Sequence, residues 1–242
     1  FHAGSTWVGP GTDNLMLGSN SGLGMTEGDE NIFIGGNAGL HAGTGNTVVG
    51  MNAGGGGASL HTEVTLLGRS AATANGLTNA TALGSKASVT SSNALVLGSI
   101  NGVNGATADV NVGIGTTAPQ RALHVSRGAS GGTSNANAVV VVEDNTNAYI
   151  NLMTPSANES GILFGSPTSN AAGAVMYNQS STPDGLAFRT NGNVTRAVID
   201  AGGLMGIGVL TPATRMDING GLTLRRPATV SAPVGTSTVT VG

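Results

Sequence analysis

Short apolar runs that end in glycine recur through the first half of this 242-residue chain and constrain its fold more than any other feature. Each run is too short for a helix and is rich in aliphatic and β-branched residues, so each is expected to be a strand. A glycine that closes each run allows a positive φ or a close backbone approach at a corner. The closing glycines are Gly18, Gly35, Gly50, Gly68, Gly84, Gly98 and Gly115.

Successive closing glycines are 14 to 18 residues apart, which predicts a parallel β-solenoid, or β-roll, over residues 12–115. Segments of small residues between the runs can supply a second short strand and its turn. Seven coils stacked at the spacing of neighbouring strands would extend roughly 30 Å. A glycine-rich chain contains some such runs by chance. Chance is disfavoured here because three runs begin with Asn and two are followed by Asn-Ala-Gly.

The composition limits how such a solenoid can be stabilised. Glycine supplies 41 residues, charged residues are 9% of the chain against a usual value of about 25%, and only seven residues are aromatic. The apolar fraction of 39% and the net charge of −3 are unlike those of a disordered chain. Narrow coils bury few large side chains, whereas each ordered residue costs about 1–2 kcal/mol of backbone entropy. We therefore expect apolar faces to pair between copies, in a parallel homotrimer with cyclic closure.

Several function classes are disfavoured by composition. Nine basic residues and a negative net charge argue against a nucleic-acid partner, and no apolar run is long enough to insert into a membrane. The absence of cysteine excludes disulfides and Cys-ligated zinc. The chain begins at Phe1 rather than Met, so we expect a processed or truncated piece of a longer protein.

A second repeat follows the solenoid. Residues 111–125 and 204–218 match in register 93 positions apart, each with a Gly-Ile-Gly turn, a proline and an apolar pair. We interpret both as structural junctions that link β modules in series. The corresponding residues are Gly113, Ile114, Gly115, Pro119, Leu123 and Val125 in the first junction, and Gly206, Ile207, Gly208, Pro212, Met216 and Ile218 in the second.

Between the junctions the sequence also predicts strands. Residues 137–145, 148–154, 161–166, 172–178, 185–191 and 195–200 contain β-rich runs, and turn signals stand at residues 182–185 and 190–193. These predict a compact antiparallel or interleaved domain of about six strands. The expected organisation is a lead-in at 1–11, the β-roll at 12–115, a junction with a β domain at 116–205, and a second junction with the start of a further β module at 206–242.

Two resemblances add to this interpretation. Residues 79–99, "NATALGSKASVTSSNALVLGS", resemble the head repeats of trimeric autotransporter adhesins, which form left-handed parallel β-rolls. Residues 111–128 and 187–224 resemble the junctions of bacteriophage tail fibres and related bacterial tail-fibre-domain proteins. Val209 and Leu210 depart from that pattern, where two small hydroxyl residues are usual. The C-terminal chaperone domain of related fibres, which is cleaved off, is not recognisable here, as expected for a trimmed product.

Few residues suggest chemistry, and we expect no catalytic, cofactor-binding or metal-binding residue. The four histidines, His2, His41, His61 and His124, are scattered and are expected at turns or on the surface. Glu27, Asp29 and Glu30 could offer oxygen ligands to calcium, but an acidic solvated loop is the favoured interpretation. The glycines at 54–57 lack the lysine of a phosphate loop. Glu143 and Asp144 are adjacent and would point to opposite faces of a strand, unlike a glycosidase pair.

Three functions remain open from the sequence. The favoured one is an extracellular attachment fibre, in a virion tail fibre or on a bacterial cell surface, with a surface glycan or protein as receptor. The second is a subunit of a self-assembling extracellular filament or sheath, with end-to-end contacts between copies. The least favoured is a polysaccharide-degrading tailspike, because one Trp and two Tyr provide few sugar-stacking platforms.

Overall fold

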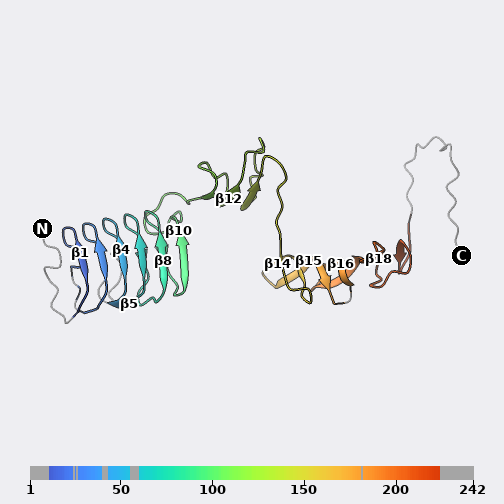
Figure 1. The fold of residues 1–242 in the computed structure, drawn as a ribbon, viewed down its shortest axis with the longest axis horizontal. Helices are drawn as coiled ribbons and strands as arrows, with labels where there is room; N and C mark the ends of the chain where they lie inside the picture. The colour runs from blue at the N-terminus through green and yellow to red at the C-terminus, as the bar shows by residue number, and fades with distance from the viewer. Residues whose placement is uncertain are drawn as a thin grey trace. The chain divides into compact units, whose positions relative to one another are not determined.

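The computed structural model describes residues 11–23, 25, 27–39, 43–54, 60–180 and 182–223. These residues form strands, turns and loops and contain no helix, which confirms the all-β prediction (Figure 1). The chain divides into two compact units, residues 1–149 and 150–242, and each is described by itself.

The first unit begins with a parallel β-solenoid, as predicted. Each strand of its main sheet pairs with the next in unbroken register, so the chain returns to the same sheet once per coil. Figure 1 shows these strands stacked side by side, from blue to green. In sheet order they are β1 (Leu15–Leu17), β2 (Ile32–Ile34), β4 (Thr47–Val49), β6 (Thr65–Leu67), β8 (Ala80–Leu83) and β10 (Ala94–Leu97).

The remainder of each coil supplies shorter pairs. Strand β3 (Gly43–Thr44) lies parallel to β5 (His61–Thr62), and β7 (Ala72–Thr73) lies parallel to β9 (Ser88–Val89). These two-residue strands match the expected second strand of a coil.

The solenoid interior is built from one inward side chain per main strand and small residues opposite. Phe33, Val48 and Leu66 are central residues of their strands and are fully buried. The third residue after each of the first five closing glycines also faces inward, and four of these positions hold buried alanines: Ala38, Ala53, Ala71 and Ala87. The Asn-Ala-Gly motif therefore combines a left-handed corner Asn with an inward alanine.

The corner glycines are required by close stacking between coils. Gly35 has a φ of +132°, and a Cβ atom there would lie 2.6 Å from the carbonyl oxygen of Gly50 in the next coil. Corresponding glycines at 18, 50 and 68 would also meet the next glycine's backbone. Substitution would therefore both strain the backbone and separate adjacent coils.

A buried asparagine ladder fixes the register of the first coils. Asn31 Nδ2 donates to Asn14 Oδ1, and Asn46 Nδ2 donates to Asn31 Oδ1, both at 3.0 Å. Asn46 Oδ1 accepts the backbone N–H of Val64, where the ladder ends in an aliphatic residue. These amides satisfy one another away from solvent, which lets the initial Asn of each run lie inside the coil.

The seventh run does not join this sheet. Gly98 has a φ of +82° instead of the 129–143° of the earlier corners at 18, 35, 50, 68 and 84, and Val110 occupies the space beside it. Strand β11 (Val112–Ile114) instead pairs in parallel with β12 (Leu123–Ser126), which pairs in parallel with β13 (Val140–Glu143). The expectation that residues 111–115 close the main sheet is therefore wrong.

The second unit contains a six-stranded sheet in sequence order. The first five strands are antiparallel to their neighbours, and the last pair is parallel. The strand predicted at 148–154 is absent, and Tyr149 and Met153 are more than four-fifths exposed. Alternation alone does not make a strand where no neighbouring strand pairs with it. The strands are β14 (Ser160–Ser166), β15 (Ser169–Gln179), β16 (Thr182–Thr190), β17 (Val194–Ile199), β18 (Met205–Ile207) and β19 (Met216–Ile218).

Candidate functional site

The outer surface of the main solenoid sheet is the most distinctive candidate site. The first and third residues of the three-residue strands, and the second and fourth of β8 and β10, point outward and form two rows along the stack. We call this surface the apolar face. Its rows are Leu15, Ile32, Thr47, Thr65, Thr81 and Leu95, and Leu17, Ile34, Val49, Leu67, Leu83 and Leu97.

Nine of these twelve side chains are aliphatic, and the second row is aliphatic throughout. Leu17 is 59% exposed, and Leu67, Leu83 and Leu97 are each more than 40% exposed. The row extends about 24 Å, or five strand spacings. A continuous exposed apolar strip of this kind marks an interaction surface on a folded protein, unlike scattered single side chains.

The other two sheets also have an apolar row. In the three-stranded sheet, Ile114, Val125 and Val142 lie in register on one surface, with Ile114 55% exposed. In the second unit, one row crosses all six strands, and its Ile162, Phe188 and Ile207 are each more than 40% exposed. That row is Ile162, Val175, Phe188, Ala197, Ile207 and Ile218.

The two predicted junctions have the same local structure. Each is a short strand, a turn with a loop, and a second strand that pairs in parallel with the first. Ile114 pairs with Val125 and Ile207 pairs with Ile218 at equivalent positions. A Cβ on Gly113 would lie 2.6 Å from Thr116 O, and one on Gly206 would meet Val209 O, so both glycines fit against the returning loop. Gly115 and Gly208 both have positive φ, of 75° and 70°.

Two different side chains perform one role in these junctions. The His124 Nδ1 atom accepts the backbone N–H of Gln120, and Asp217 Oδ2 accepts that of Ala213. Both N–H groups follow the junction proline, and both acceptors lie four residues later. The shared role is therefore to hold the loop after Pro119 and Pro212, which explains how His and Asp occupy equivalent positions.

His124 also connects to a polar cluster on the covered side of the three-stranded sheet. It is 2% exposed, and its Nε2 atom lies 3.0 Å from Glu143 Oε2. Because Nδ1 accepts a hydrogen bond, Nε2 carries the proton that points to the carboxylate. Hydrogen bonds from the Ser130 N–H and hydroxyl, with a smaller contribution from His124, hold the pKa of Glu143 below its usual value.

This cluster borders a cavity of about 210 Å³ that Gln120 and Ser134 also line. Its connectivity differs from that of a catalytic triad, in which a histidine accepts the proton of the nucleophilic hydroxyl. Here the Ser130 hydroxyl donates to Glu143 and no histidine nitrogen accepts its proton. Asp144, which follows the end of β13, pairs instead with Arg127, so the adjacent carboxylates bind different partners.

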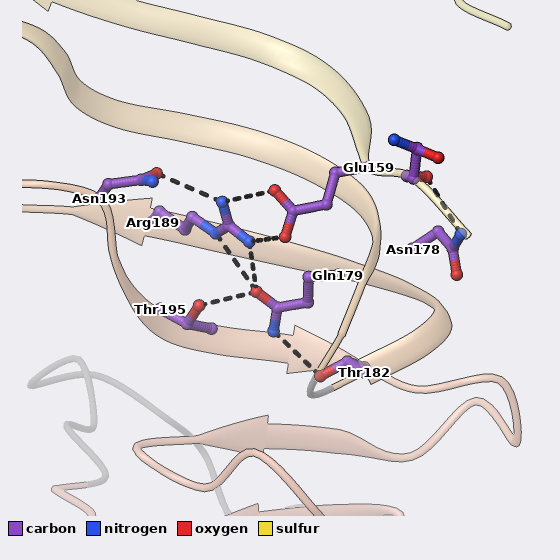
Figure 2. Close-up of polar contacts among 8 residues, drawn as sticks. Glu159, Asn178, Gln179, Thr182, Arg189, Asn193 and Thr195 are labelled. Atoms are coloured by element: carbon purple, nitrogen blue, oxygen red, sulfur yellow. Dashed lines mark hydrogen bonds and ion pairs between the residues drawn. The ribbon is translucent and has the colours of Figure 1, made fainter. Parts of the chain in front are cut away.

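A polar network of side chains lies in the second unit and surrounds Arg189 (Figure 2). This arginine on β16 is 8% exposed, and its Nη2 and Nη1 atoms bind the two oxygens of Glu159 at 2.5 and 3.1 Å. Its Nε and Nη2 atoms also donate to Gln179 Oε1, which accepts the Thr195 hydroxyl as well. Gln179 in turn donates to the Thr182 hydroxyl.

The Arg189 network joins the segment before β14 to three strands of the sheet. Its donors and acceptors bind one another, so the network fixes structure and holds no obvious group for chemistry. Sequence reasoning missed it, although a signal was present. Leu186 and Phe188 lie on one side of β16, so alternation directs Arg189 to the covered side with Ala187.

Two histidine predictions are wrong. His61 is fully buried within the solenoid and His124 is nearly so, although surface or turn positions were expected. His61 Nδ1 accepts the Leu77 N–H, and burial lowers the pKa of His61. His2 and His41 lie outside the described residues, as do the glycines at 55–57.

Among the described residues, no group of three His, Asp or Glu side chains is arranged to hold a metal ion. Glu27 and Glu30 are exposed. None of the described segments forms a helix that could span a membrane. No protein-family model matches the chain, and no curated protein matches it either.

Proposed function

We propose that this chain is a structural fibre protein that assembles as a parallel homotrimer and attaches to a host or cell surface. The observation that carries the proposal is the apolar face of the solenoid. Three such faces directed toward a common axis would bury the two rows along the whole stack. Each partly exposed aliphatic side chain would gain about 1 kcal/mol from this burial.

A second copy of the chain is the partner that best fits these surfaces. The partner must be apolar along the solenoid, along the three-stranded sheet and along the six-stranded sheet. Another copy has the same three surfaces in the same order, so parallel copies match one another. Cyclic symmetry would then close the assembly without leaving an apolar face uncovered.

The junctions support a fibre of modules in series. The same β-loop-β unit occurs at 112–126 and at 205–218, each time beside a different sheet. We infer the module order given by the sequence: β-roll, junction with a small β domain, then a second junction with a further module. The resemblances to adhesin heads and to tail fibres favour an extracellular location, in a virion or on a bacterium, and a glycan or protein receptor.

The polar clusters favour a non-catalytic role. Glu143 is engaged by His124 and Ser130, Asp144 by Arg127, and Glu159 by Arg189. Carboxylates that act in glycoside hydrolysis need one group held protonated and one free to act on the sugar. Release of reducing sugar from capsular polysaccharide would instead support the tailspike alternative.

Light scattering coupled to size-exclusion chromatography tests the assembly. Three chains of 23.6 kDa predict a molar mass of about 71 kDa, and a stable monomer would overturn the proposal. The double variant Leu67→Lys/Leu83→Lys places charges on the apolar face and should yield monomers. The control, Thr62→Lys/Thr78→Lys, adds the same charges at exposed positions off that face and should remain trimeric.

The filament alternative gives a different result in the same preparation. End-to-end association would appear as long polymers in negative-stain images and as a mass that rises with concentration. Discrete rods of one length with a fixed mass of three chains favour the attachment fibre. Binding of fluorescent wild-type rods to candidate host or bacterial cells then tests the attachment function directly.

A further inference from the structure

The apolar face is bordered by two unlike edges. Two positions before the first outward residue of each main strand lies a residue with a left-handed conformation. We call this row the leading edge. It consists of Asp13, Glu30, Gly45, Glu63, Asn79 and Asn93.

Backbone hydrogen bonds hold the leading edge as a regular row. Glu30 N donates to Thr12 O, Glu63 N donates to Thr44 O, and Asn79 N donates to Thr62 O. Glu30 and Glu63 are exposed. The leading edge therefore presents carboxylates in its first, second and fourth coils, a glycine in its third and amides in its last two.

The opposite border, the trailing edge, follows the closing glycines. Its residues are Ser19, Asn20, Gly36, Asn37, Met51, Asn52, Arg69, Ser70, Ser85 and Lys86. Asn20 Nδ2 donates to Asn37 Oδ1 and Asn37 Nδ2 donates to Asn52 Oδ1, so the first three coils present stacked carboxamides. The next two coils present the cations Arg69 and Lys86. This edge contains no carboxylate.

Cyclic symmetry determines which edges meet. Rotation about an axis parallel to the solenoid keeps every strand's direction around the ring. The end of a strand in one copy therefore lies next to the start of a strand in its neighbour. A leading edge then faces a trailing edge. An antiparallel pair would instead place leading edge against leading edge and bring carboxylates together.

The charges match level by level when copies are in register. Glu63 and Arg69 both flank β6, and both are exposed. Asp13 and Glu30 would face the carboxamides of Asn20 and Asn37, and Asn79 would face Lys86. No coil places like charges at the same level. Among the described residues, neither Glu63 nor Arg69 has an ionic partner.

We propose that Glu63 of one copy forms an ion pair with Arg69 of the next copy, and that the three equivalent pairs hold the trimer parallel and in register. The inference rests on the proposed homotrimer and adds its direction and register. Within one chain Glu63 and Arg69 lie beyond opposite ends of β6, at most about 20 Å apart, and no ion pair joins them. The pair is thus an intermolecular contact.

Cross-linking of engineered cysteines tests the geometry, since the chain has no native cysteine. The full-length double variant Glu63→Cys/Arg69→Cys is treated with a short bismaleimide that cannot span the distance within one chain. Covalent trimers on a denaturing gel are expected. The single variant Glu63→Cys should stay monomeric on that gel, because leading edges do not meet. Covalent dimers of Glu63→Cys would overturn the proposal in favour of an antiparallel assembly.

Charge reversal tests the ion pair itself. Glu63→Arg and Arg69→Glu should each raise the concentration at which trimers dissociate by about tenfold in low salt, and the double reversal should restore most of the loss. The effect should shrink in 1 M salt. Glu27→Arg, an exposed charge reversal off both edges, is the control. If light scattering finds wild-type trimers but the double reversal restores nothing, the ion pair is wrong and the trimer stands. A wild-type protein that is monomeric would overturn both the ion pair and the trimer.

Discussion

The solenoid and the six-stranded sheet of the second unit both have one covered side and one apolar outer side, but they are stabilised in different ways. In the solenoid, each coil repeats the same small set of contacts, namely corner glycines, an inward aliphatic and a stacked amide. In the second unit, adjacent antiparallel strands supply the backbone pairing, and one network around Arg189 ties the sheet to the preceding segment. A destabilising substitution should therefore affect neighbouring coils in the solenoid, whereas in the six-stranded sheet its effect should stay near the substituted residue.

Gly35→Ala should have the largest effect, because it breaks the contact that every coil repeats. Its Cβ would lie 2.6 Å from Gly50 O at a φ of +132°, so two coils must separate. We expect a loss of unfolding free energy of about 4 kcal/mol or more. Chemical denaturation followed by circular dichroism measures this loss.

The matched control is Gly102→Ala. Gly102 also has a positive φ, of 78°, but nothing lies within 4 Å of the added Cβ. Its cost should be limited to the left-handed conformation, about 1–2 kcal/mol. Equal losses in the two variants would mean that stacking of glycines contributes nothing beyond backbone strain.

Arg189→Leu should destabilise the second unit by about 3 kcal/mol, a value below the upper range for buried pairs because Glu159 is partly exposed. Hydrogen exchange read by mass spectrometry should accelerate in peptides from 159–199 and remain unchanged in 60–98. Arg196→Leu, at an exposed position on β17, should leave both regions unchanged. Faster exchange in the solenoid would contradict independent stabilisation of the two regions.

The sequence predicted the solenoid well because its repeated signals are local. Closing glycines, initial asparagines and inward alanines each have the same role in the coils that contain them, so the repeat itself identifies that role. The strand at 148–154 failed for the opposite reason, since its alternation needed a pairing strand that periodicity does not identify. The end of the solenoid at Gly98 was missed because Val110, twelve residues later, occupies the space beside it.

The polar clusters were harder to predict because they depend on residues far apart in the chain. Glu159 and Arg189 are separated by 30 residues, and His124 and Glu143 by 19. Such pairs become visible only when strand register is known. The junctions were predictable as a repeat, but the equivalence of His124 and Asp217 follows from hydrogen-bond geometry rather than from residue type.

Asn46→Val tests whether the amide ladder contributes to the register of the solenoid. The substitution leaves the Val64 N–H without a partner and removes the amide donor to the His61 carbonyl oxygen, whereas Asn31 Oδ1 still accepts the backbone N–H of residue 46. The loss should cost about 1–3 kcal/mol. Asn52→Gly removes an exposed ladder amide but accommodates the φ of +57° at this position, so it should cost less than about 0.5 kcal/mol. Thermal unfolding of the two variants side by side measures the difference. Similar stability would mean that a buried aliphatic row serves as well as amides.

Acidification should have the smallest effect on stability. It should destabilise the solenoid, which contains the buried His61, more than the six-stranded sheet, which contains no histidine. Burial lowers the pKa of His61 below the ordinary value of about 6.5, so the unfolded chain binds a proton more readily than the folded chain does. The stability that the neutral ring contributes is therefore complete above about pH 6.5 and falls as the pH decreases below that value. Protonation would also remove the Nδ1 lone pair that accepts the Leu77 N–H.

Hydrogen exchange at pH 7.5 and 5.5, corrected for the intrinsic rate, measures this effect region by region. Protection in 60–98 should decrease on acidification, whereas protection in 160–199 should hold, because residues 150–242 contain no histidine. His61→Gln retains an amide acceptor for the Leu77 N–H without a titratable ring, so it should remove the pH dependence of the solenoid. If the variant keeps that dependence, another group is responsible, and the buried histidine does not distinguish the solenoid from the sheet.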